Sequence, residues 1–317
     1  MQFLLISFSI CCFGLLLLLK TKLVNIALDK PNERSLHIKE TPRTGGLAIM
    51  FAVLITWLML SVNWYLVLLP FCLMLVSLMD DIYHLSVKWR LLAQLLISVI
   101  FVLMMTSAIS WWLIISITLL ITWMTNLYNF MDGSDGLAGG MGLFGFWAYA
   151  VAAFLVGDLN FALMNGVIAA TCLAFLFFNF YPSKIFMGDS GSIPLGFLAG
   201  AMGVYGYFQA LWPIWFPILI FSPFIVDATV TLIKRQATGE KIWQAHRSHY
   251  YQRLIQMGFG HTKTALAEYT LMFTLSCTSI LMLDTNSVWK MSFMIIWCIV
   301  YFILMYLIDE KWNKQVC

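Results

Sequence analysis

The chain has 317 residues, of which 62% are hydrophobic and 10% are charged, and its formal net charge is +3. Soluble globular proteins carry about 25% charged residues, so this composition excludes a water-soluble fold and intrinsic disorder. No basic tract suits a nucleic acid, and the seven cysteines follow no zinc spacing, so we expect free thiols.

Apolar runs close to the 20 residues that cross a bilayer recur along the whole chain. We predict eleven spans, with ten or twelve also possible, near 2–19, 46–62, 64–79, 91–108, 111–127, 137–156, 160–179, 193–209, 213–232, 264–283 and 289–308. The first is expected to be uncleaved, with its N-terminus outside, because Lys20 and Lys22 follow it and no basic residue precedes it. The predicted fold is an all-α polytopic membrane protein, a single domain over 1–317 with a cytoplasmic C-terminus.

The distribution of basic residues supports this topology. The predicted cytoplasmic loops are 20–45, 80–90, 128–136, 180–192 and 233–263. Together with the C-terminal tail they contain all of the 18 basic residues except Lys290. Lysine and arginine are enriched in cytoplasmic loops, and a wrong span count would scatter them over both sides.

Carboxylates gather at the cytoplasmic ends of these spans. They are Asp80, Asp81, Asp132, Asp135, Asp189 and Asp227, the last of them inside the ninth predicted span. Aspartate at the centre of a spanning helix costs roughly 2.5–3.5 kcal/mol, so several at one interface indicate a site for a cation and its ligand. For Asp80 and Asp81, which end the third span, salt bridges to Lys88 or Arg90 are the structural alternative.

The segment 126–136 alternates Asn and Asp with glycines between two predicted helices. Gly133 and Gly136 permit tight turns and a close approach of backbone to a ligand. Asp135 is also a candidate N-cap of the next helix. A calcium loop is disfavoured, because the closing glutamate of the EF-hand pattern is absent.

The segment 186–192 places Asp189 between glycines and two serines, a set of oxygen donors that suits magnesium. The amides of Gly191 and Ser192 begin a helix and could face a phosphate. An ordinary capped turn is the alternative.

The last loop joins His246, Arg247 and His249 to two tyrosines, a mixture typical of phosphate recognition. Binding of anionic lipid is the alternative there.

Together, these segments resemble the polyprenyl-phosphate N-acetylhexosamine-1-phosphate transferase family, glycosyltransferase family 4, over residues 29–253. The Pro-Asn-x-Arg…His…Pro-Arg-x-Gly-Gly pattern occupies 31–46, and the Asp-Asp pair is followed by Leu85, Arg90 and Gln94. Two further motifs are Asn-Phe-Met-Asp-Gly-x-Asp-Gly-Leu-Ala from 129 and Phe-x-Gly-Asp-x-Gly-Ser at 186–192. The last loop is similar to the O-antigen-initiating branch, rather than to phospho-MurNAc-pentapeptide translocase.

The resemblance implies transfer of a HexNAc-1-phosphate from a UDP-sugar to undecaprenyl phosphate, with release of UMP. The expected place is the cytoplasmic face of a bacterial inner membrane, where the product starts O-antigen or a related glycan, and a homodimer is possible. The implied cofactor is Mg²⁺, or Mn²⁺, bound by Asp189, with Asp80 at the lipid phosphate and Asp81 orienting the metal shell. The implied substrate-binding residues are Asn129, Asp132, Asp135, His246, Arg247, His249 and Arg43.

Two other readings remain open. An ion-coupled transporter also has intramembrane carboxylates, usually near the midplane and within inverted repeats, whereas this chain has no evident repeat and its acids lie at one edge. A CDP-alcohol phosphotransferase has an Asp-Gly-x-x-Ala-Arg core, but Gly139 stands in the place of the arginine.

Overall fold

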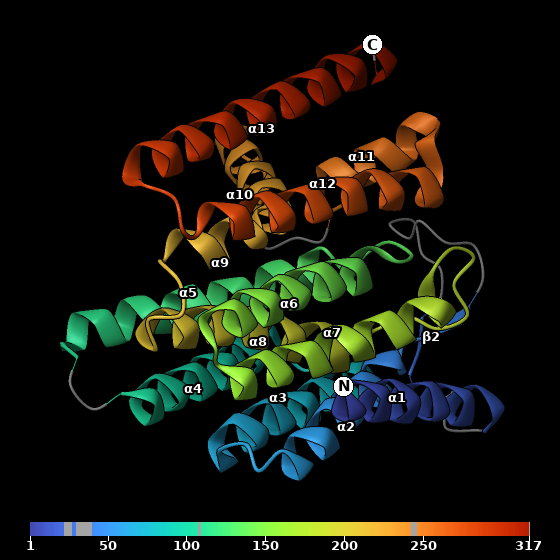
Figure 1. Ribbon diagram of the computed structural model, residues 1–317. Helices are drawn as coiled ribbons and strands as arrows, with labels where there is room; N and C mark the ends of the chain where they lie inside the picture. Colours follow the sequence, from blue (N-terminus) through green and yellow to red (C-terminus); the bar gives the residue numbers. More distant parts are fainter. Residues whose placement is uncertain (22–26, 30–39, 107–108, 242–245, 317) are drawn as a thin grey trace.

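The computed structural model describes residues 1–21, 27–29, 40–106, 109–241 and 246–316. Most of this chain forms long apolar helices that run side by side (Figure 1). The long helices are α1 (Gln2–Lys20), α2 (Gly45–Met59), α3 (Trp64–Tyr83), α4 (Val87–Met105), α5 (Trp111–Phe130), α6 (Leu137–Val156), α7 (Leu159–Asn179), α8 (Asp189–Phe208), α10 (Ser222–Ala237), α12 (Gly260–Met282) and α13 (Ser287–Val316). The short ones are α9 (Trp215–Ile220), α11 (Tyr250–Leu254) and a π-helical turn, Ile255–Phe259.

Eight helical segments of the described chain are long and apolar enough to cross a membrane, and α2 is a shorter apolar helix. The predicted class, an all-α polytopic membrane protein, is therefore confirmed. The count of eleven spans and the orientation remain predictions.

The ninth predicted span, 213–232, is not one helix. α9 ends at Ile220 and α10 begins at Ser222, with Pro223 in the first turn of α10. Proline lacks a backbone N–H and its ring clashes with the preceding turn, so it fits the first turn of a helix and interrupts a longer one.

The centre of the bundle is α8, whose residues are nearly all buried from Ser190 to Val204. Helices α2, α3, α5 and α6 pack against it, and α1, α2 and α6 pack against α7. In contrast, α13 lies at the periphery, where Phe293 and Trp297 form a small separate cluster with Leu275 of α12. The first turn of α8 is therefore enclosed by several helices, so side chains from those helices can meet there to form a functional site.

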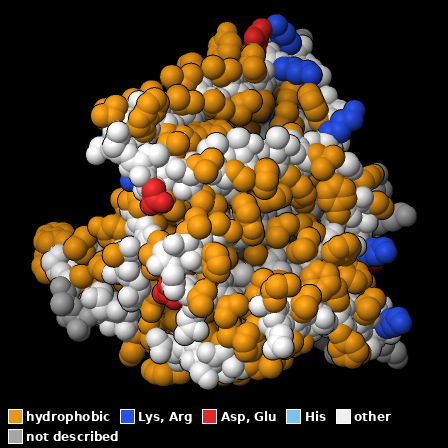
Figure 2. Space-filling view, in the orientation of Figure 1, with side chains coloured by type: hydrophobic (Ala, Val, Ile, Leu, Met, Phe, Trp, Pro, Cys, Tyr) orange, Lys and Arg blue, Asp and Glu red, His pale blue; other side chains and the backbone are white. Residues whose placement is uncertain are grey.

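One end of the bundle collects the loops that carry the sequence motifs. We call it the motif end; it holds the α3–α4, α5–α6 and α7–α8 connections, together with residues 27–29, 40–44 and 246–249 of the α1–α2 and α10–α11 connections (Figure 1). Here β1 (Leu28–Asp29) pairs antiparallel with β2 (Thr41–Pro42). Most Lys and Arg side chains visible in Figure 2 lie along this end, whereas hydrophobic side chains cover the flank. These are the connections that the sequence predicts to be cytoplasmic.

Candidate active site

The C-terminal turn of α3 meets the N-terminus of α8 at the motif end. The carboxylate of Asp81 accepts hydrogen bonds from the backbone N–H groups of Asp189 (3.3 Å) and Ser190 (3.0 Å). The first N–H groups of a helix have no partner within it, and a negative charge is favourable at that end of the helix dipole. Asp81 therefore fixes the position of the Asp189 segment relative to α3.

The Arg90 guanidinium, in the first turn of α4, joins two carboxylates. Its Nη1 lies 2.6 Å from Oδ2 of Asp80 and 3.2 Å from Oδ2 of Asp189. Asp80 is buried, whereas Arg90 and Asp189 are half-buried. The salt bridge considered as a structural role for Asp80 exists, and the same arginine brings Asp80 to Asp189.

Asn129, at the end of α5, completes the contacts of the Asp189 side chain. Its Nδ2 donates to Oδ1 of Asp189 at 2.9 Å and to Oγ of Ser192 at 2.9 Å. Asp189 thus contacts α5 and α4 through its carboxylate and α3 through its backbone. Three motifs that are far apart in the sequence converge on this one residue.

Asp132 lies two residues beyond α5, is half-buried, and interacts electrostatically with Asp189, Asp81 and Arg43. Burial raises the pKa of Asp132 well above its ordinary value, the Asp189 carboxylate raises it further, and the Arg43 guanidinium opposes both. Asp132 and Arg43 are therefore electrostatic neighbours of Asp189.

The segment 42–46 runs alongside the segment 186–191. The amides of Gly45 and Gly46 donate to the carbonyls of Phe186 (2.9 Å) and Met187 (2.8 Å). A Cβ on Gly46 would lie 2.2 Å from the Cα of Gly191, so both positions require glycine for this approach. The earlier part of the first-loop pattern, 31–39 with His37, lies outside the described residues.

Asp135 has a different environment from the other predicted site residues. It is buried, and its Oδ2 accepts the backbone N–H of Ser183 at 3.1 Å. Its side chain is thus directed to the α7–α8 loop. The N-cap position of α6, considered for Asp135, is occupied by Gly136, whose N–H donates to Asn179.

Asp227 of α10, which no motif explains, holds the last loop. Its carboxylate accepts the backbone N–H groups of Tyr250 (2.9 Å) and Tyr251 (3.0 Å), and its Oδ1 lies 3.2 Å from Nδ1 of His249. These amides begin α11, so Asp227 satisfies their unpaired donors from a neighbouring helix. In the sequence, the only sign of a role for Asp227 is a carboxylate inside a predicted span. That sign does not identify the last loop as its partner.

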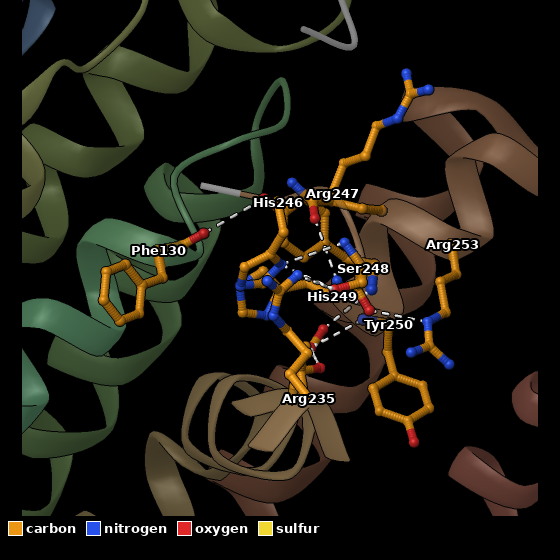
Figure 3. A network of polar contacts seen from close by, with 12 residues as sticks. Phe130, Arg235, His246, Arg247, Ser248, His249, Tyr250 and Arg253 are labelled. Carbon is orange, nitrogen blue, oxygen red and sulfur yellow. Dashed lines mark hydrogen bonds and ion pairs between the residues drawn. The ribbon is translucent and has the colours of Figure 1, made fainter. Parts of the chain in front are cut away.

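The two loop histidines lie side by side in Figure 3, with ring centroids 4.7 Å apart, whereas the exposed Arg247 points away from them. Burial, with neighbouring His249 and Arg235, lowers the pKa of His246 to about 4, so this imidazole is neutral near pH 7. Tyr251 Oη donates to the carbonyl of Phe130 at 3.5 Å, which joins the last loop to the segment containing Asn129 and Asp132.

The donor set at Asp189 fits a magnesium ion shared with a substrate. Within the described ranges, no group of three or more His, Cys, Asp and Glu side chains is arranged as a metal centre. Magnesium commonly takes one or two protein carboxylates and fills its octahedral shell with water and phosphate oxygens. The half-buried Asp189, with Asp80 beside it, could supply those carboxylates.

Sequence reasoning missed Glu268, an acid inside α12 that interacts electrostatically with Asp227. An ionisable residue within a spanning helix is a recognisable signal of function, so the sequence contains the information that would indicate Glu268. The side-chain partners of Ser192 and Tyr251, which are Asn129 and the carbonyl of Phe130, depend on helix packing and have no signal in the sequence.

Comparison with known proteins adds independent information. Residues 63–207 match the family model described as Glycosyl transferase family 4. Over 295 residues the chain is 31% identical to a Bacillus subtilis protein named "Probable undecaprenyl-phosphate N-acetylglucosaminyl 1-phosphate transferase", covering 87% of this chain and 82% of that one. Identity is 29% to the decaprenyl-phosphate N-acetylglucosaminephosphotransferase of Mycolicibacterium smegmatis, with coverage of 77% and 72%. It is 25% to a phospho-N-acetylmuramoyl-pentapeptide-transferase of Oceanobacillus iheyensis, with coverage of 68% and 76%. These relatives are transferases and give no support to the transporter alternative.

Proposed function

The chain belongs to glycosyl transferase family 4, and on this basis we propose that it transfers N-acetylglucosamine 1-phosphate from UDP-N-acetylglucosamine to undecaprenyl phosphate. The observation that carries the proposal is the contact of Arg90 with both Asp80 and Asp189, which joins two family motifs in one cluster of charged side chains. We propose N-acetylglucosamine as the sugar because the names of the Bacillus and Mycolicibacterium relatives specify it. The proposed product starts a lipid-linked glycan, O-antigen or a related envelope polysaccharide, at the cytoplasmic face of a bacterial inner membrane.

In this reaction an oxygen of the lipid phosphate attacks the β-phosphorus of the UDP-sugar. The bond from that phosphorus to the oxygen bridging the two phosphates breaks, and UMP leaves with the electron pair. A phosphate monoester has its second pKa near 6 and is mostly dianionic at pH 7, so little base catalysis is needed. Positioning and charge neutralisation dominate such phosphoryl transfers.

The carboxylates have separate proposed roles. Asp189 would hold Mg²⁺, or Mn²⁺, which when bound supplies neutralisation of the charge that builds up on the diphosphate. Asp80, buried next to Arg90, would position the lipid phosphate, and Asp81 would keep the start of α8 in register with α3. Asn129 orients the Asp189 carboxylate through its amide.

The last loop and the first loop are the proposed donor site. Arg43, beside Asp132, and the exposed Arg247 offer cations for the diphosphate, and neutral His246 offers a hydrogen bond without a charge. His249 is oriented by Asp227. Asp135 would act on the donor indirectly, through the α7–α8 loop that its carboxylate contacts.

The test is a panel of UDP-sugars with the purified protein and undecaprenyl phosphate. UDP-N-acetylglucosamine with magnesium should give UMP and a lipid heavier by one N-acetylhexosamine phosphate. UDP-N-acetylgalactosamine and UDP-glucose should react more slowly. A faster reaction with another sugar would replace the proposed donor, and no product with any of them would remove the proposed activity.

A further inference from the structure

The peripheral helix α13 reaches back to the motif end, where one of its carboxylates contacts the last loop. Its apolar contacts include Phe293 and Trp297, in the small cluster with Leu275. Asp309 lies a further twelve residues along α13, roughly 18 Å from Trp297 at the helical rise of 1.5 Å per residue. The contacts of Asp309 therefore lie well away from the apolar cluster and are separate from it.

Asp309 binds side chains from two other elements. Oδ1 lies 2.8 Å from Nη1 of Arg253, in α11. Oδ2 forms an ion pair with Lys234 of α10 and accepts the hydroxyl of Tyr250 at 3.1 Å. Lys234 also donates to the same hydroxyl at 2.6 Å. A single carboxylate thus gathers α10 and α11 against α13.

Arg253 carries this contact into the last loop. Its Nε donates to the carbonyl of Ser248 at 2.8 Å, and its guanidinium lies over the rings of Tyr250 and Trp312. Ser248 lies between the two loop histidines, and its hydroxyl contacts Nδ1 of His246 at 2.9 Å. Figure 3 shows Arg253 bonded to this turn, and Arg235 also contacts the Ser248 hydroxyl at 3.4 Å. Asp309 thus reaches Ser248 through the Arg253 side chain.

The loop is consequently held from two sides. Asp227 binds the backbone amides of Tyr250 and Tyr251, and Asp309 binds the side chains of Tyr250 and Arg253. We infer that Asp309 is a positioning residue for the UDP-sugar: it holds the His246–His249 turn in the conformation that binds the donor. This inference rests on the proposed function, because it takes the last loop as part of the donor site.

A charge-assisted hydrogen bond is roughly twice as strong as a neutral one, and a loop that is already held in its binding conformation binds its ligand more tightly than one that must be ordered on binding. Asp309→Asn keeps the size of the side chain and removes its charge. We expect the KM for the UDP-sugar to rise about tenfold, with kcat within about twofold and the KM for undecaprenyl phosphate unchanged. Asp309→Glu, which restores the charge, should recover part of the loss.

Glu310 provides the matched control. It is the next residue of α13, also forms an ion pair, and its partner is the exposed Lys314 on the same helix. Glu310→Gln should leave both KM values and kcat unchanged. If Asp309→Asn does not accumulate in the membrane, Lys234→Gln, which removes one partner of the same carboxylate, is measured in its place.

Amide hydrogen exchange separates this inference from the proposed activity. Exchange of the peptide covering residues 246–253 should be faster in Asp309→Asn than in the wild type and unchanged in Glu310→Gln. If the wild type makes no lipid product but this exchange pattern appears, the proposed function fails and the structural link stands. An unchanged KM for the UDP-sugar, or an unchanged exchange rate in the loop, would overturn the inference.

Discussion

The carboxylate of Asp81 accepts the backbone N–H of Ser190 at 3.0 Å across a sequence separation of 109 residues. The contact joins the Asp-Asp motif to the Gly-Asp-Ser-Gly motif through the backbone. The first turn of α8 therefore starts at a fixed place relative to α3, and the side chain of Asp189 comes within reach of Arg90 and Asn129. The site depends on this junction of two helix ends.

Removal of this helix cap should destabilise the protein. Asp81→Ala leaves the amides of Asp189 and Ser190 without their side-chain acceptor, at a cost of about 0.5–2 kcal/mol, the usual range for a lost N-cap. The thermal unfolding midpoint in detergent should fall accordingly. An unchanged midpoint would mean that water or another group replaces Asp81 as the acceptor.

Asp189→Asn should abolish magnesium-dependent UMP release while the protein still inserts and folds. The amide keeps the shape of the side chain but loses the charge that the metal and Arg90 need. Asp158→Asn is the control, because Asp158 caps α7 through the N–H of Phe161, away from the motif end, and should keep full turnover. Substantial turnover in Asp189→Asn would remove the metal assignment.

Close packing between α2 and α8 predicts a steric effect at Gly46. Gly46→Ala places a methyl group 2.2 Å from the Cα of Gly191, so the backbone must shift, and the cost should be about 1–3 kcal/mol, as for overpacking. Both the unfolding midpoint and turnover should fall. The nearest atoms to a Cβ in Gly166→Ala, in α7, belong to the Leu4 side chain at 3.5–3.6 Å, an ordinary contact distance, so this variant should not be destabilised. Equal unfolding midpoints and turnover for the two variants would contradict the close contact of α2 with α8.

His246 predicts a pH dependence of stability with a definite sign. Its pKa is about 4 in the folded protein and near 6.5 when unfolded, so the unfolded chain binds the proton more tightly. The contribution of the neutral imidazole is fully present above pH 6.5 and is lost as the pH falls towards 4. The unfolding midpoint of His246→Gln should therefore decline less steeply than that of the wild type between pH 6.5 and 4. Parallel declines would show that His246 does not titrate in this way.

Much of the architecture could be predicted from the sequence because apolar runs and basic loops are local signals. The predicted span 137–156 coincides with α6 (Leu137–Val156), and 160–179 with most of α7 (Leu159–Asn179). The division between α9 and α10 could not be placed, since proline at a helix start and proline that breaks a span look alike in the sequence.

The sequence predicts the site residues whose type and motif indicate their chemistry. It does not predict the residues whose role depends on which distant segment they contact. Asp80, Asp132 and Asp189 were grouped from their motifs, and the structure brings them together. The partners of Asp227 and Asp135 are backbone amides of distant segments, which depend on how helices pack. Any carboxylate can accept such bonds, so the sequence gives no means of choosing among the candidates.

The fate of the donor's β-phosphorus tests the central claim most directly. With UDP-N-acetylglucosamine labelled at the β-phosphate, undecaprenyl phosphate and magnesium, the protein should move the label into the lipid fraction and release unlabelled UMP. The Asp189→Asn variant should leave the label in the aqueous donor. Release of labelled UDP, or of labelled water-soluble sugar phosphate without a labelled lipid, would contradict transfer of a sugar phosphate by this site.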